Sequence, residues 1–373
     1  MSGLVGEVMS PLVRIIHFGP IIALSIIKCV FFTTLWLTSQ WLRMTDSFIP
    51  FINYLLYYTF IAIVLYNFFS AVFVGPGFVP KGWRPESTQD IELMQFCGQC
   101  DGYKPARSHH CRRCDRCVMK MDHHCPWINN CTGYRNQCYF IVFLLSAVLG
   151  SIQSIVLLGM GLYRAFYVNW YLYNDRSDRL VYISMTSLLF TVFSIGLAIG
   201  VIVAVGGLLV IQLKIVVRNQ TSIEEWIVTK AMGRKRDDVF VYPYNIGIWG
   251  NIKQVLFEPI HSGIEWPVID GCNQYTLTVE QLLQKEEKRN RSVTCVAIED
   301  YSGAWFPISK GWRICVSFPL TDEPRIGVTC GDHILVTRWK KHWLYGERLK
   351  TEAHKRERGW FPRRLVVQVH TAK

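Results

Sequence analysis

Residues 97–131 read CGQCDGYKPARSHHCRRCDRCVMKMDHHCPWINNC, and this stretch decides how the segment around it folds. It holds seven of the thirteen cysteines and four of the ten histidines in a chain of 373 residues. Two pairs of cysteines, Cys97 with Cys100 and Cys111 with Cys114, have the spacing with which proteins hold tetrahedral zinc. The clustering predicts metal and thiol chemistry in a reducing compartment rather than a disulfide framework.

One cysteine of this stretch is left over when metal ligands are counted. Six cysteines and two histidines would complete two closed zinc sites, with no open position at either metal. Cys125 is the seventh cysteine, and it directly follows Asp122, His123 and His124. A histidine can take the proton of a nearby thiol, and an aspartate can orient the ring. Cys125 is therefore a candidate nucleophile.

Apolar runs on both sides of this stretch are long enough to cross a bilayer, which takes about 20 residues. Half of the chain is apolar and only 18% is charged, which excludes a disordered or collagen-like chain. The sequence therefore predicts a polytopic α-helical membrane protein with four transmembrane helices, at residues 18–42, 48–74, 138–163 and 182–216.

The basic residues predict which ends of these helices face the cytosol. Of the forty Lys and Arg, nine lie in residues 75–136 and twenty-five lie from Lys214 onward. Basic residues concentrate in cytosolic loops, so the Cys/His stretch, the tail and both termini are expected in the cytosol. The formal net charge of +12 fits such basic faces. A zinc protein that binds nucleic acid is disfavoured, because four spans would tether it and the basic residues form no recognition helix.

The tail changes character along its length. Residues 214–266 are mixed and are expected to pack on the membrane domain, and residues 275–292 are expected to form a helix and linker. Beyond residue 292, short β-like runs such as HILVTRW alternate with turn residues, which predicts a small β-barrel of about 75 residues. No internal repeat is evident.

The string CRRCDRCVMKMDHHCPWINNC, preceded by KPARSHH and followed by an apolar span, closely resembles the DHHC cysteine-rich domain of membrane protein S-acyltransferases. The resemblance implies a protein-cysteine S-palmitoyltransferase. Such an enzyme passes a fatty acyl group from acyl-CoA, through an acyl-cysteine, to cysteines of substrate proteins at the bilayer. It also implies that Asp122, His123 and Cys125 are catalytic, and that two structural zinc ions are held by Cys97, Cys100, His110 and Cys117 and by Cys111, Cys114, His124 and Cys131.

Three outlying motifs resemble motifs of the same family. The turn Gly75-Pro76-Gly77 matches the family's Asp-Pro-Gly except at its first position. Thr221-Ser222-Ile223-Glu224 resembles Thr-Thr-x-Glu, with serine keeping the hydroxyl, and is expected to anchor the zinc domain. Asn251, within PYNIGIWGNIKQVLF, matches the asparagine of the family's C-terminal motif.

The final β unit resembles a Src-homology-3 barrel, with AIEDY ending at Tyr301 and GWFP beginning at Gly359. The stretch between Tyr301 and Gly331 is about twice the usual loop length, and Leu365 stands where peptide-binding barrels carry tyrosine. Proline-rich peptides dock on aromatic ridges, so this unit is expected to dock or regulate by another face. Family members with such a barrel are enzymes of the endoplasmic reticulum, which implies that location here.

The expected function has one rival. A zinc-stabilised membrane scaffold without turnover is the alternative, but a scaffold has no need of an unligated thiol. For the enzyme, Phe140, Phe143, Leu144 and Ala147 have the helical spacing of residues that line an acyl cavity below Cys125, and ordinary helix packing is the alternative explanation of the same stripe. The family resemblance implies that bulk deeper in this helix limits acyl length, and Gly150 there is small.

The sequence predicts an organisation in five parts. They are 1–74 (N-terminal tail and two helices), 75–137 (zinc-binding catalytic domain), 138–216 (two helices), 217–292 (C-terminal motifs and linker) and 293–373 (Src-homology-3-like domain).

Overall fold

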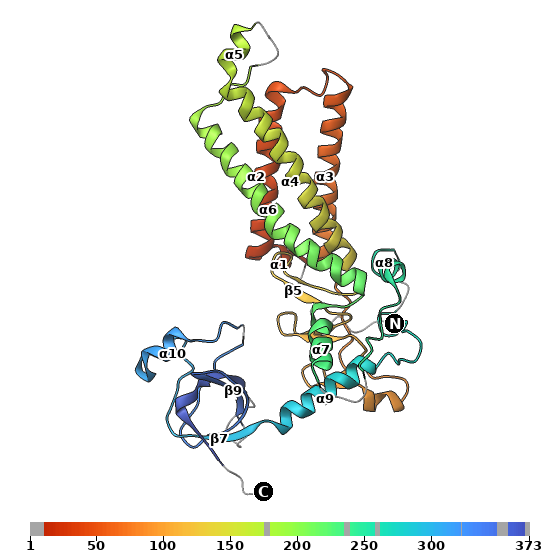
Figure 1. Cartoon of the computed structure of the whole chain (residues 1–373), viewed down its shortest axis with the longest axis vertical. Helices are drawn as coiled ribbons and strands as arrows, with labels where there is room; N and C mark the ends of the chain where they lie inside the picture. Colours follow the sequence, from red (N-terminus) through yellow and green to blue (C-terminus); the bar gives the residue numbers. More distant parts are fainter. Residues whose placement is uncertain are drawn as a thin grey trace. The chain divides into compact units, whose positions relative to one another are not determined.

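The computed structural model of the chain describes residues 11–174, 180–234, 239–257, 262–321, 323–348 and 357–369. The chain divides into two compact units, Met1–Glu280 and Gln281–Lys373, each with a hydrophobic core of its own. Figure 1 shows the first unit as a bundle of long helices that continues into a cluster of short hairpins. The finer division into five parts remains a prediction.

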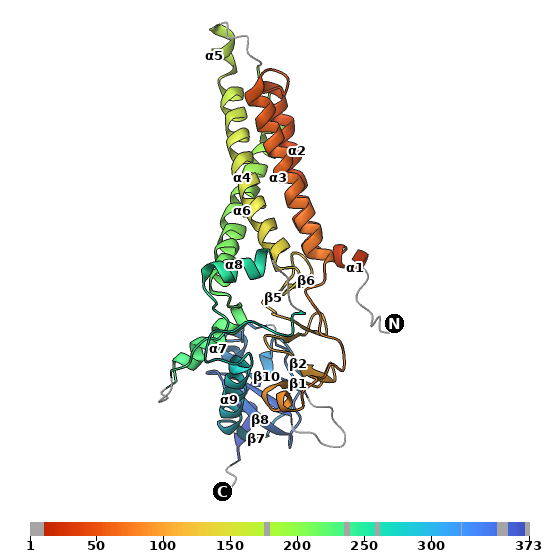
Figure 2. The same cartoon turned by 90° about the vertical axis from the view of Figure 1, so that its right-hand side faces the viewer.

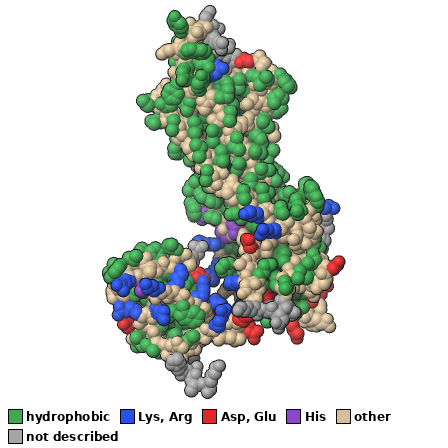
Figure 3. All heavy atoms as spheres, in the orientation of Figure 1, with side chains coloured by type: hydrophobic (Ala, Val, Ile, Leu, Met, Phe, Trp, Pro, Cys, Tyr) green, Lys and Arg blue, Asp and Glu red, His purple; other side chains and the backbone are tan. Residues whose placement is uncertain are grey.

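Four long helices form the bundle: α2 (Phe18–Trp41), α3 (Phe48–Phe73), α4 (Gln137–Phe166) and α6 (Met185–Arg218). Among the described residues, these four are long and apolar enough to cross a membrane, which confirms the four predicted spans. Hydrophobic side chains cover the visible face of the bundle (Figure 3), as lipid contact requires. The short helices α1 (Pro11–Ile15) and α5 (Val168–Tyr173) lie at its opposite ends (Figure 2).

Helix α4 packs against α2, α3 and α6 and holds the bundle together. At Gly161 the approach is close, because a Cβ there would lie 2.6 Å from Leu37 Cδ2 of α2. Small residues allow such packing between membrane helices, whose association depends on van der Waals contact. Helices α3 and α4 also share a hydrogen bond of 3.1 Å between the Tyr57 hydroxyl and Ser154 Oγ. The helix that follows the Cys/His stretch thus contacts all three of the other long helices.

Three short antiparallel hairpins between α3 and α4 carry the Cys/His stretch. Their turns contain Asp101, Asp115 and Asn129, which have positive φ values of 49°, 49° and 45°. Asp and Asn tolerate this left-handed conformation better than most other residues. The hairpins are β1–β2 (Gln95–Cys97 and Gly102–Lys104), β3–β4 (His109–Cys111 and Arg116–Val118) and β5–β6 (His123–Cys125 and Asn130–Thr132).

These hairpins repeat every 14 residues, so the expectation of no internal repeat was wrong. The first strands of the three hairpins end at Cys97, Cys111 and Cys125. In each hairpin, this cysteine lies opposite the residue five positions later in the sequence. The positive-φ turn residues repeat at the same interval. Only the ligand positions and the turn are shared, so composition hides the repeat. The spacing of the cysteines alone could have found it.

After α6 the chain returns to the Cys/His stretch through α7 (Ser222–Met232), α8 (Ile248–Leu256) and the start of α9 (Thr276–Asn290). Tyr244, Trp266 and Tyr275 are buried in one cluster with Ala106 of the Cys/His stretch. Helix α8 packs on α6 and α4. The predicted packing of the tail on the membrane domain and the predicted helix in residues 275–292 are therefore confirmed.

The second unit is a five-stranded antiparallel sheet in the order β10-β9-β8-β7-β11. Trp343, Phe361 and Ile334 are fully buried in its core. The last strand of this unit returns to pair with its first, so the sheet is strongly curled (Figure 1). The strands are β7 (Val293–Ala297), β8 (His333–Trp339), β9 (Trp343–Arg348), β10 (Arg358–Pro362) and β11 (Val366–Gln368).

This sheet does not close into the predicted barrel. Strands β10 and β11 are its two edges, and the described residues show no pairing between them. The free edge of β10 is covered by residues 324–326 instead. Trp360 N donates to Pro324 O at 2.9 Å, and Ile326 N donates to Trp360 O at 3.2 Å. The long segment after Tyr301 therefore occupies the edge that closure would need.

Candidate active site and metal centres

The first Cys/His cluster joins the first two hairpins. Nδ1 of His110 lies 3.5 Å from the sulfur of Cys97, 3.4 Å from that of Cys100 and 3.9 Å from that of Cys117. Two of the four side chains of this cluster, Cys97 and Cys100, come from the β1–β2 hairpin. The other two side chains, His110 and Cys117, lie opposite each other in the β3–β4 hairpin. The four donor atoms lie within 4.8 Å of one another.

The second cluster joins the next two hairpins by the same rule. Cys111 and Cys114 come from the β3–β4 turn, and His124 and Cys131 face each other across β5–β6. Nδ1 of His124 lies 3.4 Å from the sulfur of Cys114 and 3.6 Å from that of Cys131. Each turn thus shares a cluster with the strands of the following hairpin.

Both clusters have the composition of a closed structural zinc site, with three thiols and one imidazole each. Sulfur ligands at about 2.3 Å from a tetrahedral metal lie about 3.8 Å apart. The sulfurs of Cys114 and Cys131 are 3.6 Å apart, which agrees with this geometry. The two clusters therefore fit two zinc ions, and the structure brings together the same two sets of four residues that the family resemblance implies.

Cys125 lies outside both clusters. It occupies the repeat position of Cys97 and Cys111, but Ile128 stands where those hairpins have their second cysteine. Cys125 and Ile128 are buried among apolar side chains of the bundle, including Phe140. Alternate residues of a strand share a face, so Cys125 and His123 face one side of β5 and His124 faces the other.

Asp122 and His123 form a hydrogen-bonded pair next to this thiol. Asp122 Oδ2 lies 2.8 Å from Nδ1 of His123. Gln212 Nε2, from α6, donates to the same oxygen at 2.8 Å, and the Ser222 amide donates to Oδ1 at 2.8 Å. Sequence reasoning missed Gln212, although a glutamine within a long apolar run was a signal. The carboxylate is thus fixed by partners about a hundred residues away in sequence.

The pKa values of this pair favour a charged aspartate and a charged histidine. Burial opposes the charge on Asp122, but the bonds from His123, Ser222 and Gln212 outweigh burial and hold the pKa of Asp122 below its ordinary value. Burial also opposes a charged His123. Interactions with Asp122 and Cys125 outweigh it and raise the pKa of His123 to about 9. The ring can therefore keep, at neutral pH, a proton that it takes from the neighbouring Cys125 thiol.

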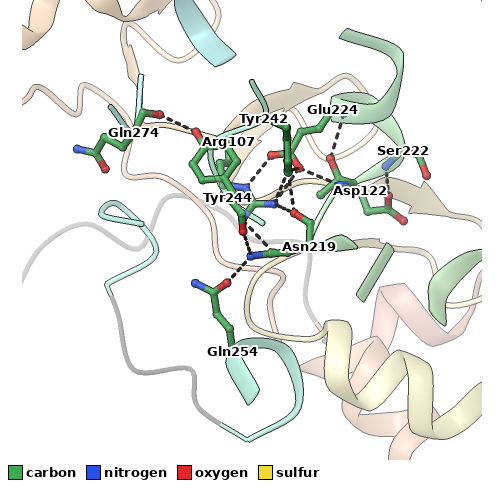
Figure 4. Close-up of polar contacts among 10 residues, drawn as sticks. Arg107, Asp122, Asn219, Ser222, Glu224, Tyr242, Tyr244, Gln254 and Gln274 are labelled. Carbon is green, nitrogen blue, oxygen red and sulfur yellow. Dashed lines mark hydrogen bonds and ion pairs between the residues drawn. The ribbon is translucent and has the colours of Figure 1, made fainter. Parts of the chain in front are cut away.

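Arg107 links the Cys/His stretch to the start of α7 (Figure 4). Its guanidinium is fully buried and donates to both carboxylate oxygens of Glu224, at 2.7 and 2.8 Å. It also donates to the side chain and the carbonyl of Asn219, at 3.1 and 2.7 Å. The rings of Tyr244 and Trp266 lie 4.3 and 4.7 Å from its central carbon. A buried charge needs such partners, and here they come from three separate segments.

The motif at residues 221–224 forms the N-terminus of α7. Thr221 and Glu224 make a capping box, and Glu224 is therefore fixed where it meets Arg107. Ser222 contacts Asp122 through its backbone amide. Asn251 is fully buried and donates to Val217 O at 2.8 Å, so the C-terminal motif braces the end of α6. The expected anchoring of the Cys/His domain by residues 221–224 is confirmed.

Two asparagines that sequence reasoning missed fix the hairpins to α3. Asn130 Nδ2 lies 3.2 Å from Ala71 O and 3.1 Å from Val74 O. Asn136 Nδ2 lies 3.3 Å from Ala71 O. The last carbonyls of a helix have no partner within the helix, so these amides satisfy them. In the nearby turn, Gly77 has a φ of 91° and accepts from Met119 N at 2.8 Å.

An apolar cavity of about 350 Å³ opens below Cys125 inside the bundle. Cys125 and Trp127 line it together with residues of α2, α3, α4 and α6. The α4 residues run from Phe140 to Ser154, which corresponds to about 21 Å along the helix. The residues expected at this cavity all line it: Phe140, Phe143, Leu144, Ala147 and Gly150.

Comparison with known proteins agrees with this site. A family model described as DHHC palmitoyltransferase matches residues 91–228. Palmitoyltransferase ZDHHC6 of Homo sapiens is 45% identical over 383 residues, which cover 96% of this chain and 93% of that protein. The protein of the same name from Danio rerio is 43% identical over 376 residues, with coverage of 95% and 91%. Probable protein S-acyltransferase 16 of Arabidopsis thaliana is 32% identical over 233 residues, with coverage of 58% and 76%. The chain therefore belongs to the DHHC palmitoyltransferase family.

Proposed function

We propose that this protein is an S-acyltransferase that moves a fatty acyl group, such as palmitoyl, from acyl-CoA to cysteines of substrate proteins. The position of Cys125 carries the proposal. Its thiol belongs to neither Cys/His cluster, interacts with His123 and lines an apolar cavity. A zinc-stabilised scaffold would use none of these features, whereas acyl transfer through a cysteine uses all of them.

In the first proposed step His123 activates the Cys125 thiol. Nδ1 of the ring is bonded to Asp122, which leaves Nε2 to accept the thiol proton. The Cys125 sulfur then attacks the thioester carbonyl of acyl-CoA and forms a new carbon–sulfur bond. The bond to the CoA sulfur breaks, and the proton held by His123 passes to the departing thiolate. Asp122 stabilises the charged ring during this exchange.

The second step repeats this chemistry with a protein thiol. His123 accepts the proton of the substrate cysteine, whose sulfur attacks the acyl carbonyl on Cys125. The thioester to Cys125 breaks, and Cys125 leaves as a thiolate that regains its proton from His123. Because a covalent acyl-enzyme separates the two half-reactions, we expect ping-pong kinetics.

The cavity supports a donor with a long acyl chain. Each methylene that moves from water into an apolar environment contributes about 0.8 kcal/mol, so withdrawing a long chain from the membrane would be prohibitive. A nucleophile at the mouth of a cavity within the bundle avoids this cost. We therefore place the acyl chain along α4, with its carbonyl at Cys125.

We assign the two clusters a structural role as zinc sites. Zinc would supply tetrahedral cross-links between hairpins that have little apolar core of their own. His124 would fix β5, and thereby the direction in which His123 and Cys125 face. The proposed ligands are Cys97, Cys100, His110 and Cys117 at one zinc and Cys111, Cys114, His124 and Cys131 at the other.

The proposed site faces the cytosol, and both termini share that side. The concentration of Lys and Arg in residues 75–136 and in the tail supports this orientation. Acyl-CoA and protein thiols are then available on the same side of the membrane. The resemblance to barrel-bearing family members supports a location in the endoplasmic reticulum.

The test is to label the purified full chain with an alkyne-bearing fatty acyl-CoA. We expect a covalent label that neutral hydroxylamine releases, because hydroxylamine cleaves thioesters. A cysteine-containing substrate peptide should then take up the label. If the zinc-loaded protein acquires no hydroxylamine-sensitive label, the proposed acyl transfer is wrong and the scaffold remains.

A further inference from the structure

The second unit contains an insertion that acyl transfer does not use. In the sequence, residues 302–327 separate Tyr301 from Val328, whose backbones are joined by two hydrogen bonds of 2.7 Å. The short helices η2 (Ile308–Lys310) and α10 (Trp312–Val316) lie within this segment. We call residues 302–327 the aromatic insertion.

One face of the aromatic insertion is packed on the core of the sheet. Ile314 is buried, and its carbonyl accepts a hydrogen bond of 3.1 Å from Trp343 Nε1. Phe318 packs against the same core. These two contacts hold the insertion on the core of the sheet.

Other apolar side chains of the insertion are exposed. Six large side chains within 16 residues have exposed fractions between 58% and 83%. Soluble surfaces rarely carry such a concentration of apolar groups unless something binds there. Figure 3 shows hydrophobic side chains gathered along the edge of this unit where Figure 1 places α10. The six are Trp305, Phe306, Ile308, Trp312, Val316 and Leu320.

Basic side chains accompany these exposed side chains. Lys310 and Arg313 lie within the insertion, and Arg364 donates to Lys310 O at 3.0 Å. Glu299 is an acidic neighbour, 2.9 Å from Lys310 and 3.5 Å from Arg364. The acidic residues of the insertion are Asp322 and Glu323, near its end, and Glu323 forms an ion pair with Arg338 of β8. From residue 281 onward, eighteen Lys and Arg stand against ten Asp and Glu, so the unit as a whole is basic.

We propose that the aromatic insertion is an interfacial membrane anchor that places its six exposed apolar side chains in the headgroup region of an anionic leaflet. Tryptophan and phenylalanine favour that depth, and Lys and Arg are attracted to anionic lipids. Four helices already tether the chain to a bilayer, so the lipid surface is present at a high effective concentration. The choice of the cytosolic leaflet rests on the orientation proposed above.

This proposal also gives the second unit a docking face other than the peptide ridge. Leu365 is fully buried, and Tyr301 is buried with its hydroxyl bonded to Ala304 O. Neither can contribute to an exposed aromatic ridge, which proline-rich peptides require. The exposed aromatic side chains lie on the insertion instead.

The experiment uses the full chain in lipid nanodiscs, with the photo-crosslinking residue p-benzoylphenylalanine in place of Trp312 or, independently, of Val316. Irradiation should attach one phospholipid at either position, detected as an added mass on the corresponding peptide. The matched control has the same photoprobe in place of Trp339, an exposed aromatic residue on β8. We expect at least about fivefold less phospholipid adduct there, because this position lies outside the anchor.

The lipid composition tests the basic residues. Nanodiscs of phosphatidylcholine with phosphatidylserine should give more adduct at position 312 than nanodiscs of phosphatidylcholine alone. Equal yields would show that Lys310 and Arg313 do not attract the insertion to anionic lipid. Absence of phospholipid adducts at both 312 and 316 would overturn the anchor. So would crosslinking to a protein instead of lipid in native membranes. Acylation of Cys125 is not the readout, so these outcomes are independent of the proposed enzymatic function.

Discussion

A single residue separates the proposed nucleophile from the metal-binding pattern of the other two hairpins. Ile128 replaces the second cysteine of the third hairpin, so Cys125 has no neighbouring thiol with which to hold a metal. The buried isoleucine instead completes the apolar surroundings of Cys125. His124 remains a member of the second cluster, while His123, on the other side of β5, pairs with Asp122. Adjacent histidines therefore have different partners, and we propose different tasks for them.

The first prediction contrasts two cysteines. Cys125→Ser should retain two zinc ions and normal folding but lose self-acylation by at least about a hundredfold, because a hydroxyl hardly ionises at neutral pH. Cys131→Ser should lose metal and stability together, since it removes a thiolate from a closed site. The measurements are zinc content and acyl-probe labelling.

The adjacent histidines supply the control. His123→Ala should behave like the Cys125 variant, and His124→Ala like the Cys131 variant. If Cys125→Ser loses zinc or keeps full acylation, Cys125 is not the nucleophile.

The second prediction concerns Gln212 as a positioning residue. Gln212→Leu removes a donor from a buried carboxylate, which costs about 1–3 kcal/mol, so acylation should slow by about tenfold or more. Acyl-CoA should still saturate the enzyme at a similar concentration, because Gln212 does not line the cavity. The matched control is Gln153→Leu, since Gln153 is a glutamine of α4 that donates to Asn53 O at 3.1 Å instead. Equal rates for both variants would refute the positioning role.

At the scale of elements, α4 connects the hairpin that carries Cys125 with the cavity proposed to hold the acyl chain. It begins directly after the third hairpin, and its buried face supplies the cavity wall from Phe140 to Ser154. Because α4 contacts the other three long helices, the wall is fixed on all sides. Depth along α4 should therefore translate into acyl-chain length.

The third prediction uses two glycines of this helix. A Cβ at Gly150 would meet Phe60 Cβ at 3.6 Å, an ordinary contact, so Gly150→Tyr should fold with its ring in the cavity. Its acyl-CoA preference should shift toward shorter chains, since each excluded methylene forfeits about 0.8 kcal/mol. Gly159→Tyr is the control, because a Cβ there meets nothing within 4 Å. A chain-length profile unchanged by Gly150→Tyr would place the acyl chain elsewhere.

At the scale of the whole molecule, one buried charge pair ties the first unit together. Arg107 comes from the Cys/His stretch, Glu224 from α7, and Asn219 from the end of α6. Asp122 is held by the same region through Gln212 and Ser222. The orientation of the proposed catalytic pair therefore depends on the correct docking of the hairpins on the bundle.

The fourth prediction tests this docking through pH. Interactions with Arg107, Thr221 and Tyr242 outweigh the effect of burial and hold the pKa of Glu224 below its ordinary value. Glu224→Gln should destabilise the protein by about 3 kcal/mol at pH 7, because it leaves a buried guanidinium without its counter-charge.

A group with a lowered pKa contributes its stability above its unfolded pKa, about 4.3 for Glu, and loses it as pH falls through the folded pKa. The deficit of the variant relative to the wild type should therefore persist down to about pH 4 and shrink only below it. Thermal unfolding of both proteins across this range is the measurement. Acid release of metal affects both proteins alike. A deficit that does not depend on pH would contradict the charge pair.

The fifth prediction is the metal content of the whole chain. Elemental analysis should find two zinc ions per chain, because the two clusters account for eight ligands. Stripping the metal with a chelator should unfold the hairpins and abolish acylation, while the helical content of the bundle is retained. One zinc per chain, or a redox-active metal, would contradict the assignment.

Sequence alone determined the features that depend on local composition and spacing. The apolar runs specified four spans, because bilayer thickness sets the length of a helix. The types and spacing of the Cys and His residues predicted ligands for two zinc ions and one spare thiol, and the tail predicted short strands. These features can be read locally, since each depends on neighbouring residues in the chain.

Tertiary structure decided what depends on segments that meet only after folding. Gln212 reaches Asp122 across 90 residues, and Arg107 reaches Glu224 across 117. Their chemistry gave no sign of which partner each would find, because a buried polar group takes whichever partner the packing presents. The same applies to the sheet of the second unit. The strand pattern predicted a closed barrel. Residues 324–326 occupy the edge of β10 instead, and this contact between segments distant in sequence keeps the sheet open.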